Sequence, residues 1–441
     1  MSTQLSTVAA GVLADLDRSP TPYHAVERAA ALLAEAGFAA VDESQPLPPD
    51  PGGRFLVRGG SLIAWWQSSA PGFCIVGAHT DSPNLRVRTK PDVTSAGFEQ
   101  VGMEVYGGVL LNSWLDRDLG LAGRVSVEVS SGTLEARLYC DAEPILRVPQ
   151  LAIHLDREIS ERGLKLDPQR HLTPLWALDR DDRGDGDDER QKGQADPGRV
   201  RAHVAAGLGV APSQILAWDL MAFDTQSPAV VGRDGDLFAS GRIDNLVSAS
   251  CGVRALIEAA GTDTPRTPVL VLYDHEEIGS QTATGAAGPL LGATLERIAA
   301  AGGGDRTSYL ASLAASLVVS ADGAHATHPN YVDRHEPSHH IALNKGVVIK
   351  RNANQRYATD AGSEAEIVAA AAAASVPLQY YIHRNDLPCG STIGPITAAR
   401  LGIPTVDLGA PQLAMHSARE TAGLADLDHL HDLLAAVWRR S

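Results

Sequence analysis

Residues 269–280 have the sequence VLVLYDHEEIGS, in which an apolar, β-branched run ends at Tyr273 and an acidic run begins at Asp274. A parallel sheet buries such an apolar run and delivers the residues after it to the carboxyl edge of its strands, where open α/β folds bind ligands. Two adjacent carboxylates at that edge, Glu276 and Glu277, repel each other unless a positive group lies close by. A metal ion is the simplest such group, with one glutamate as its ligand and the other free to accept a proton. A merely solvated acidic loop is the alternative interpretation.

Three further strand-like runs lead to a residue that can bind a metal: residues 75–78 lead to His79, 317–319 to Asp322, and 403–406 through Gly409 to His416. Asp244, just before the helix-like run 246–260, is a fifth candidate beside the acidic stretch. Each residue alone has an ordinary explanation, because a histidine after a strand is often a satisfied polar side chain and an aspartate before a helix is often its N-cap. These ordinary explanations account less well for all the candidates together than for any one of them.

The set suits two divalent ions better than one. Zinc takes imidazole and carboxylate ligands, and one carboxylate can bridge two ions about 3.5–4 Å apart. We expect His79 and Asp322 to hold one ion. Glu277 and His416 would hold the other, with Asp244 as the bridge between them.

Asp81 lies two residues beyond His79 and is predicted to fix the tautomer of that imidazole. A nucleophilic serine is not needed for hydrolysis at such a centre, because the metals can stabilise the oxyanion. The one tempting serine, Ser391 in the run GSTIG at 390–394, stands one place too early for a nucleophile elbow.

These motifs resemble, in the same order, those of the aspartyl aminopeptidase family. They are HTDSP at 79–83, GRIDN at 241–245, DHEEIGS at 274–280, SADGAHATHPNY at 320–331 and AMHS at 414–417, with further matches SPTPYHA at 19–25 and PCGSTIGP at 388–395. The resemblance covers nearly the whole chain. It implies a dinuclear metallo-aminopeptidase that removes N-terminal Asp or Glu from peptides, with the ligand set given above and with Glu276 as the general base.

The resemblance also implies residues that contact the substrate. It places Lys350 in the pocket for the acidic side chain and makes His325 a further contact. A solvated lysine at the end of the strand-like run 344–350 is the alternative. The net charge of −16 would repel acidic peptides at long range, so the expected acid preference rests on the resemblance and on local charge.

Residues 90–235 are predicted to form an inserted, mainly β domain that splits the catalytic domain into residues 1–89 and 236–441. The motif-bearing runs stop there, and alternation such as that of 124–129 (RVSVEV) is typical of antiparallel strands. The predicted fold class is therefore α/β, with a mixed, largely parallel sheet flanked by helices. The resemblance implies that the insertion serves dimerisation and as a lid, within a tetrahedral assembly of twelve subunits. It also implies that His154 reaches a neighbouring subunit's active site, and a histidine without catalytic role is the alternative.

Two acidic stretches and one glycine need separate interpretations. The run DRDDRGDGDDE at 179–189 lacks the register of a calcium loop and is predicted to be a solvated surface loop that could alter assembly. The two histidines of DHLHD at 428–432 lie about 200° apart on a helix and could not share an ion. Gly323 stands where the family usually has a larger apolar residue, which could loosen the loop after Asp322.

Composition favours an enzyme of the cytoplasm. No run approaches the ~20 apolar residues of a membrane span, and the amino terminus is expected to form a short amphipathic helix rather than a signal peptide. The acidic balance, with a pI of about 5.3, argues against nucleic acid as a partner. Four scattered cysteines without Cys-x-x-Cys spacing suit a reducing compartment.

Two other functions remain open on the sequence. The same centre could serve a neutral-residue aminopeptidase, a carboxypeptidase or a deacylase. The chain could also be an assembly or cargo-binding protein with a vestigial site, although such a protein has no need of Glu276 beside Glu277. The ligands accept zinc, manganese or cobalt, and zinc is the expectation.

Overall fold

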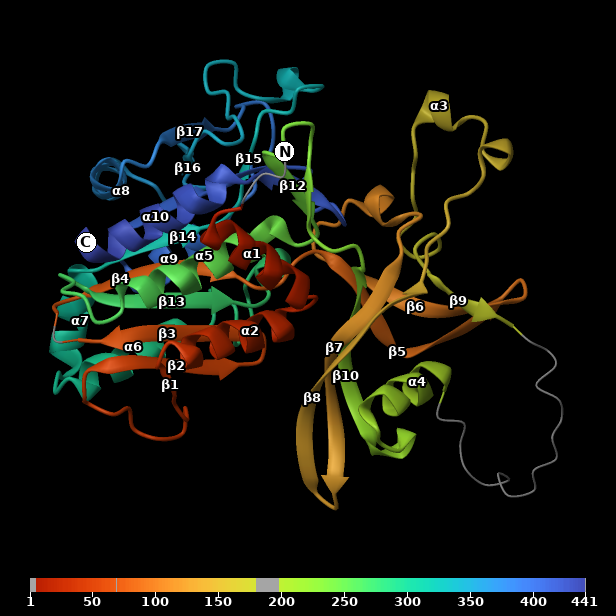
Figure 1. Ribbon diagram of the computed structural model, residues 1–441, viewed down its shortest axis with the longest axis horizontal. Coiled ribbons are helices and arrows are strands. Elements are labelled where there is room, and N and C mark those ends of the chain that lie inside the picture. Colours follow the sequence, from red (N-terminus) through yellow and green to blue (C-terminus); the bar gives the residue numbers. More distant parts are fainter. Residues whose placement is uncertain (1–4, 69, 180–197, 441) are drawn as a thin grey trace. The chain divides into compact units, whose positions relative to one another are not determined.

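The chain forms two compact units in the computed structural model, one from Met1–Ser82 and Ser227–Ser441 and the other from Pro83–Gln226. The structure describes residues 5–68, 70–179 and 198–440 (Figure 1). The boundaries expected from the sequence, at 90 and 235, lie slightly later than those of the units. The difference at the first boundary arises because the strand that begins at Asn84 already belongs to the sheet of the second unit.

The first unit is built on a mixed sheet with the strand order β1-β2-β3-β13-β4-β14-β18-β16-β17. These strands are β1 (Ala39–Ala40), β2 (Gly52–Arg58), β3 (Ser61–Gln67), β13 (Thr267–Tyr273), β4 (Phe73–His79), β14 (Leu317–Ala321), β18 (Thr405–Gly409), β16 (Val347–Arg351) and β17 (Leu378–Ile382). The neighbours β13, β4, β14 and β18 run parallel, so their carboxyl ends meet at one edge. The flanking strands β3 and β16 run antiparallel to this block. The predicted mixed, largely parallel sheet is confirmed.

The alternation of side chains along the central strands divides the core into two layers, because successive residues of a strand face opposite sides of the sheet. In β4, Cys74 and Val76 pack into one apolar cluster, whereas Phe73 and Ile75 pack into the other. Each fully buried side chain of this size contributes about 1.5–3 kcal/mol. Both faces of the central strands are therefore apolar, as the unbroken apolar runs of the sequence require.

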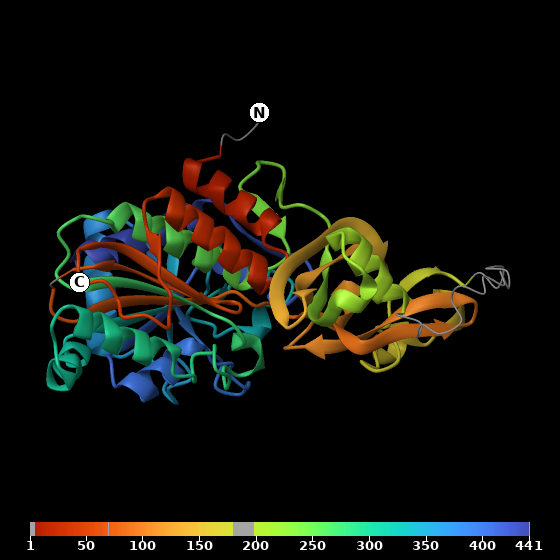
Figure 2. The ribbon, with the colours of Figure 1, turned by 90° about the horizontal axis from the view of Figure 1, so that it is seen from below.

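Helices cover both faces of this sheet (Figure 2). The first layer contains α1 (Thr7–Arg18), α2 (Pro22–Glu35), α5 (Ile243–Ala259), α8 (Ala361–Ala374) and α10 (Ala425–Arg440), and the second contains α6 (Leu290–Ala301), α7 (Arg306–Ala314) and α9 (Ile393–Leu401). In the described residues, no helix is long and apolar enough to cross a membrane.

A smaller sheet of the first unit has the order β11-β12-β20-β19-β15. Its strands are β11 (Ala229–Val231), β12 (Leu237–Ser240), β20 (Glu420–Gly423), β19 (Pro411–Leu413) and β15 (Ala324–His325). Strand β12 runs into the start of α5, where Asp244 has non-helical backbone angles, and β19 and β20 form a hairpin around His416. This small sheet therefore supports segments that come from distant parts of the sequence.

The second unit contains an antiparallel sheet in the order β8-β7-β10-β5-β6-β9. Its strands are β8 (Thr133–Leu146), β7 (Leu119–Ser130), β10 (Ile215–Asp224), β5 (Asn84–Ser95), β6 (Phe98–Tyr106) and β9 (Leu175–Leu178), accompanied by α3 (Ile159–Arg162) and α4 (Arg199–Leu208). In β7, Val125 and Val127 are buried while Arg124 and Ser126 are half-buried, which is the alternation seen in the sequence. Apart from Asp179, the acidic run 179–189 lies outside the described residues.

Candidate metal centre

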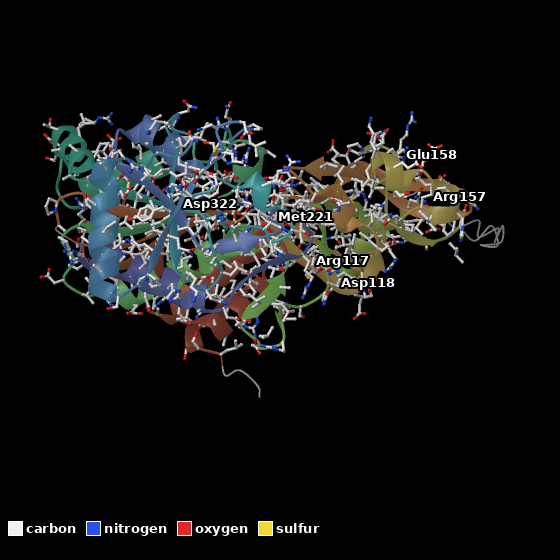
Figure 3. The ribbon with its side chains drawn as sticks, turned by 90° about the horizontal axis from the view of Figure 1, so that it is seen from above. Arg117, Asp118, Arg157, Glu158, Met221 and Asp322 are labelled. Atoms are coloured by element: carbon white, nitrogen blue, oxygen red, sulfur yellow. The ribbon has the colours of Figure 1, made fainter. Side chains whose placement is uncertain are left out.

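The carboxyl ends of the parallel strands bring most of the predicted ligands to one place. His79 is the last residue of β4, directly opposite Tyr273, the last residue of β13. The acidic residues after β13 form a short 3-10 turn, Glu276–Ile278. Asp322, labelled in Figure 3, follows β14. Because β4 lies between β13 and β14, the imidazole of His79 stands between the two acidic groups.

Asp244 lies at the centre of the cluster, with its two carboxylate oxygens towards different histidines. Its Oδ1 is 3.3 Å from Nε2 of His79, and its Oδ2 is 3.4 Å from Nε2 of His416. Nε2 of His79 is also 3.5 Å from Oδ1 of Asp322, and Nε2 of His416 is 3.4 Å from Oε2 of Glu277. The aspartate thus belongs to two groups of three at once.

Among residues 5–68, 70–179 and 198–440, three groups of side chains are close enough to hold a divalent ion. Their ligand atoms lie within 4.8 Å of one another in the sets His79, Asp244 and Asp322; Asp244, Glu277 and His416; and His79, Glu276 and Glu277. The first two sets are those expected from the sequence, with Asp244 common to both. The third set contains Glu276, so the geometry also allows this residue as a ligand.

The donor set fits divalent cations. Oδ1 of Asp244 and Oε1 of Glu277 are buried, and neither atom accepts a hydrogen bond from the described residues. Burying such oxygens without a partner is costly, and a cation is the usual remedy. His79 and Asp244 are almost fully buried, whereas Glu276 and His416 are partly exposed, so the centre is closed on one side and open on the other. Catalytic zinc sites keep an open position of this kind.

Crowding of acids shifts the pKa values of this cluster. Burial raises the pKa of Glu276 to about 8 against the opposing charge of His79, and the neighbouring Asp322 and Asp81 add to the rise. Burial and the charge of Asp244 raise the pKa of Glu277 well above its ordinary value. Burial alone would lower the pKa of His79, but the surrounding aspartates raise it well above its usual range. The cluster therefore holds protons that cations would replace.

Asp81 is completely buried beneath the acidic turn. Its Oδ1 accepts the backbone N–H of Glu276 and its Oδ2 that of Glu277, both at 3.1 Å. Its own carbonyl oxygen is 2.9 Å from Nδ1 of His79, while its carboxylate is farther away, at 3.5 Å. The sequence suggested only the contact with the imidazole, and the two backbone contacts were missed because they cross between strands that are distant in sequence.

Lys350 is 2% exposed, and its ammonium group is surrounded by oxygens. Its Nζ donates to the carbonyl oxygens of Asp322 and Gly323, at 3.0 and 3.1 Å, and lies 3.4 Å from Oδ2 of Asp322. The solvated lysine considered for the sequence is therefore wrong. A Cβ at Gly323 would lie 3.1 Å from the amide oxygen of Gln412, so the glycine lets this loop pack closely.

The two predicted histidine contacts lie in different units. His325 ends β15 in the first unit, with its ring centre 5.9 Å from that of Tyr381. His154 is exposed in a 3-10 turn, Ile153–Leu155, of the second unit. The turn is apolar around it, with Ile153 57% and Leu155 74% exposed.

A buried glutamate of the centre was missed in the sequence. Glu420, 2% exposed on β20, accepts the backbone N–H groups of Asp244 and His416. Burial and the charge of Asp244 raise its pKa to about 8. Its position four residues after His416 was the only available signal.

Comparison with known families agrees with this geometry. The sequence profile of the peptidase M18 family, described as aminopeptidase I zinc metalloprotease, matches residues 16–438. The chain belongs to the M18 family of zinc aminopeptidases. The resemblance drawn from the motifs is thereby confirmed at the level of the family.

Relatives of this M18 aminopeptidase match along nearly their whole length. A probable M18 family aminopeptidase 2 of Streptomyces coelicolor is 48% identical over 427 residues, which are 96% of this chain and 95% of the relative. A chain in the cryo-EM structure of the Ape4 and Nbr1 complex has a TM-score of 0.93 at 35% identity, covering 99% of this chain and 88% of that one. The S. cerevisiae mApe1 dodecamer has a TM-score of 0.83 at 26% identity, covering 98% and 97%.

Stabilisation by zinc should increase with pH. A glutamate in the unfolded chain has a pKa near 4.3, whereas the pKa of Glu276 in the folded protein without zinc is raised to about 8. The free energy of unfolding of the protein without zinc therefore falls as the pH rises from about 4.3 through about 8. His79, with its raised pKa, contributes stability that is complete below about pH 6.5 and is lost as pH rises through its folded pKa. Zinc bound by these residues would take the place of these protons.

Calorimetry with and without zinc would test this expectation. The zinc-induced rise in Tm should be larger at about pH 8 than at about pH 5.5. A His416→Ala variant, which lacks a predicted ligand, should show a smaller rise at both pH values. A rise that is equal at the two pH values in the unmodified protein would contradict the expectation.

Proposed function

We propose that this M18 aminopeptidase removes N-terminal Asp or Glu from peptides at a centre of two divalent ions. The observation that carries the proposal is the position of Asp244, with one carboxylate oxygen in each of two ligand groups. His79 and Asp322 would hold one ion. Glu277 and His416 would hold the other. Zinc fits the family, and the same ligands accept manganese or cobalt.

Ions bound there would activate a water and polarise the scissile carbonyl. Glu276 is the group that moves the proton. Its side chain is partly exposed on the open side of the centre, and its backbone N–H is held by Asp81. Glu276 would take the proton of the attacking water and return it to the leaving amine. Asp81 keeps Glu276 and Glu277 in register and adjoins the ring of His79.

The acid preference is assigned to positive charge at Lys350, with His325 as a further contact. Lys350 is paired with Asp322, so in the metal-free centre its charge is largely balanced. When the carboxylate of Asp322 serves a cation, the charge of Lys350 becomes available to an acidic side chain of the substrate. This makes recognition of an acidic residue depend on a filled metal centre.

Other functions are less well supported. A carboxypeptidase or deacylase is disfavoured by membership of an aminopeptidase family. A vestigial site in a cargo-binding protein is disfavoured because the ligands and Glu276 are all present. An aminopeptidase for neutral residues remains the main competitor, because it would use the same centre.

We further propose a tetrahedral dodecamer, in which His154 of one subunit contributes to the active site of another. The fold is shared with the S. cerevisiae mApe1 dodecamer. The exposed Leu151, Ile153 and Leu155 around His154 would be buried by such an interface. We propose that the enzyme acts in the cytoplasm, where its four cysteines would stay reduced.

Glu276→Gln should lower kcat by about 10²–10⁴-fold, the usual contribution of a general base, and should leave two bound ions per chain. Metal content by mass spectrometry and turnover of an N-terminal Asp peptide would be measured together. Glu277→Gln is the control, because it should lose metal as well as activity. Full activity of Glu276→Gln would refute the assigned base, and loss of an ion would instead identify Glu276 as a ligand.

Lys350→Met should reduce kcat/KM for N-terminal Asp and Glu peptides by about 10–100-fold relative to the matched Leu peptide, because a charge-assisted contact is lost. The ratio of the two substrates is the readout, since loss of the contact with Asp322 could affect both alike. Lys345→Met, an exposed lysine of the same segment, is the matched control. Faster release of Leu than of Asp or Glu by the unmodified enzyme would overturn the substrate assignment.

Leu155→Asp should break the assembly, because a charge would be buried in an apolar interface. Light scattering should give twelve times the 46.4 kDa of the chain for the unmodified protein and a smaller particle for the variant. Leu310→Asp, at an exposed leucine of α7, should leave the particle intact. An unchanged particle in Leu155→Asp would argue against an interface at this turn.

A further inference from the structure

A buried carboxylate on the small sheet contacts the backbones of two candidate ligands at once. Oε2 of Glu420 accepts the backbone N–H of Asp244 at 3.1 Å, and Oε1 accepts that of His416 at 2.9 Å. The amide of Gln412 donates to Oε1 at 3.4 Å. Three donors therefore face this one side chain, and two of them are backbone N–H groups of candidate ligands.

The contacts begin where the regular pairing of strands ends. Ser240 of β12 is the last residue paired with β20, and its partner there is Glu420. The chain then leaves the sheet and reaches Asp244, whose N–H no ladder partner can accept. His416 lies in the turn between β19 and β20, also beyond the ladder. The side chain of Glu420 thus accepts the backbone N–H groups of Asp244 and His416 beyond the end of the strand pairing.

Asp244 and His416 come from segments far apart in the sequence. To share an ion, their side chains must lie at a fixed distance from each other. Their side-chain atoms Oδ2 and Nε2 are 3.4 Å apart. Because each residue's backbone is fixed to a different oxygen of one rigid carboxylate, the distance between the two backbones is set by the width of that carboxylate.

We infer that Glu420 is a positioning residue of the metal centre, which fixes Asp244 and His416 at the separation needed to bind a common cation. The inference rests on the proposed two-ion centre and adds a residue to it that binds neither metal nor substrate. A carboxylate in this acidic neighbourhood is unfavourable unless donors and cations compensate it. The structure supplies three donors to Glu420, and the proposed ions would supply the positive charge. An apolar side chain would fill the same space without orienting either ligand.

The chemistry of the side chain gives a sharp test. A carboxylate has two acceptor oxygens, whereas the amide of Gln has one oxygen and one donor group. In Glu420→Gln, the NH₂ group must face the N–H of either Asp244 or His416, whichever way the amide is turned. One of the two ligands loses its backbone anchor although the shape of the side chain is kept.

The matched control is Asp426→Asn in the same unit. Asp426 is also a buried carboxylate that accepts two backbone N–H groups, from Asn344 at 2.5 Å and from Gly346 at 2.9 Å. Neither of those residues is a candidate ligand. Both substitutions therefore remove a carboxylate that accepts two backbone N–H groups. Glu420→Gln does so at the metal centre, and Asp426→Asn does so away from it.

Zinc alone is the probe, titrated into the metal-free full-length protein in competition with a chelating dye. Glu420→Gln should weaken the binding of at least one zinc ion by about 10–100-fold, as is usual for partners that orient metal ligands. Asp426→Asn should leave the zinc affinity within about twofold while lowering the Tm of the metal-free protein. Unchanged zinc affinity in Glu420→Gln, or equal weakening in both variants, would overturn the inference.

Exchange of backbone amides in the unmodified protein tests the same inference if Glu420→Gln does not fold. In the metal-free protein, the N–H groups of Asp244 and His416 should exchange slowly with deuterium, because Glu420 holds both before any ion binds. Rapid exchange of either amide would overturn the inference. Failure of the unmodified protein to bind two zinc ions would refute the proposed centre itself, and the inference would fall with it.

Discussion

The structure of this site depends on one constraint, the burial of a shared carboxylate between two imidazoles. Asp244 directs one oxygen to His79 and the other to His416, within a cluster that also contains Asp322 and Glu277. Two imidazoles cannot neutralise so many acids, as the raised pKa values of Glu276 and Glu277 show. Divalent cations would relieve this repulsion, and the arrangement of the acids into two groups around a common member would divide the charge between the two proposed ions.

The acidic residues are held close together by hydrogen bonds to their backbones, rather than by contacts between the ligand side chains. Asp81 accepts the N–H groups of Glu276 and Glu277 from below the turn. Glu420 does the same for Asp244 and His416 from the small sheet. Each carboxylate fixes a pair of neighbours through main-chain atoms, not through the side chains to which metal and proton are assigned in the proposal. Preorganisation of this kind lowers the cost of ordering ligands when an ion binds.

The parts of the site that follow local rules were predictable from the sequence. Apolar runs ending in His79, Asp274 and Asp322 gave buried parallel strands whose carboxyl ends meet, because strand direction and side-chain alternation are local properties. The role of Glu420 was not predictable, because it depends on the register between β12 and β20, which are nearly two hundred residues apart in the chain. The burial of Lys350 was hidden for the same reason, since its oxygen partners belong to another strand.

The contact between Lys350 and Asp322 links two properties that are usually considered separately. Asp322 lies 3.5 Å from Nε2 of His79 and 3.4 Å from Nζ of Lys350, so one carboxylate faces both the metal centre and the proposed source of acid preference. A cation bound at Asp322 would weaken the attraction of this carboxylate for the charge of Lys350, and the contact with Lys350 would in turn weaken Asp322 as a metal ligand. The proposed specificity and the metal affinity are therefore thermodynamically linked, and by reciprocity an acidic substrate that draws on Lys350 must also tighten the binding of the ion at Asp322.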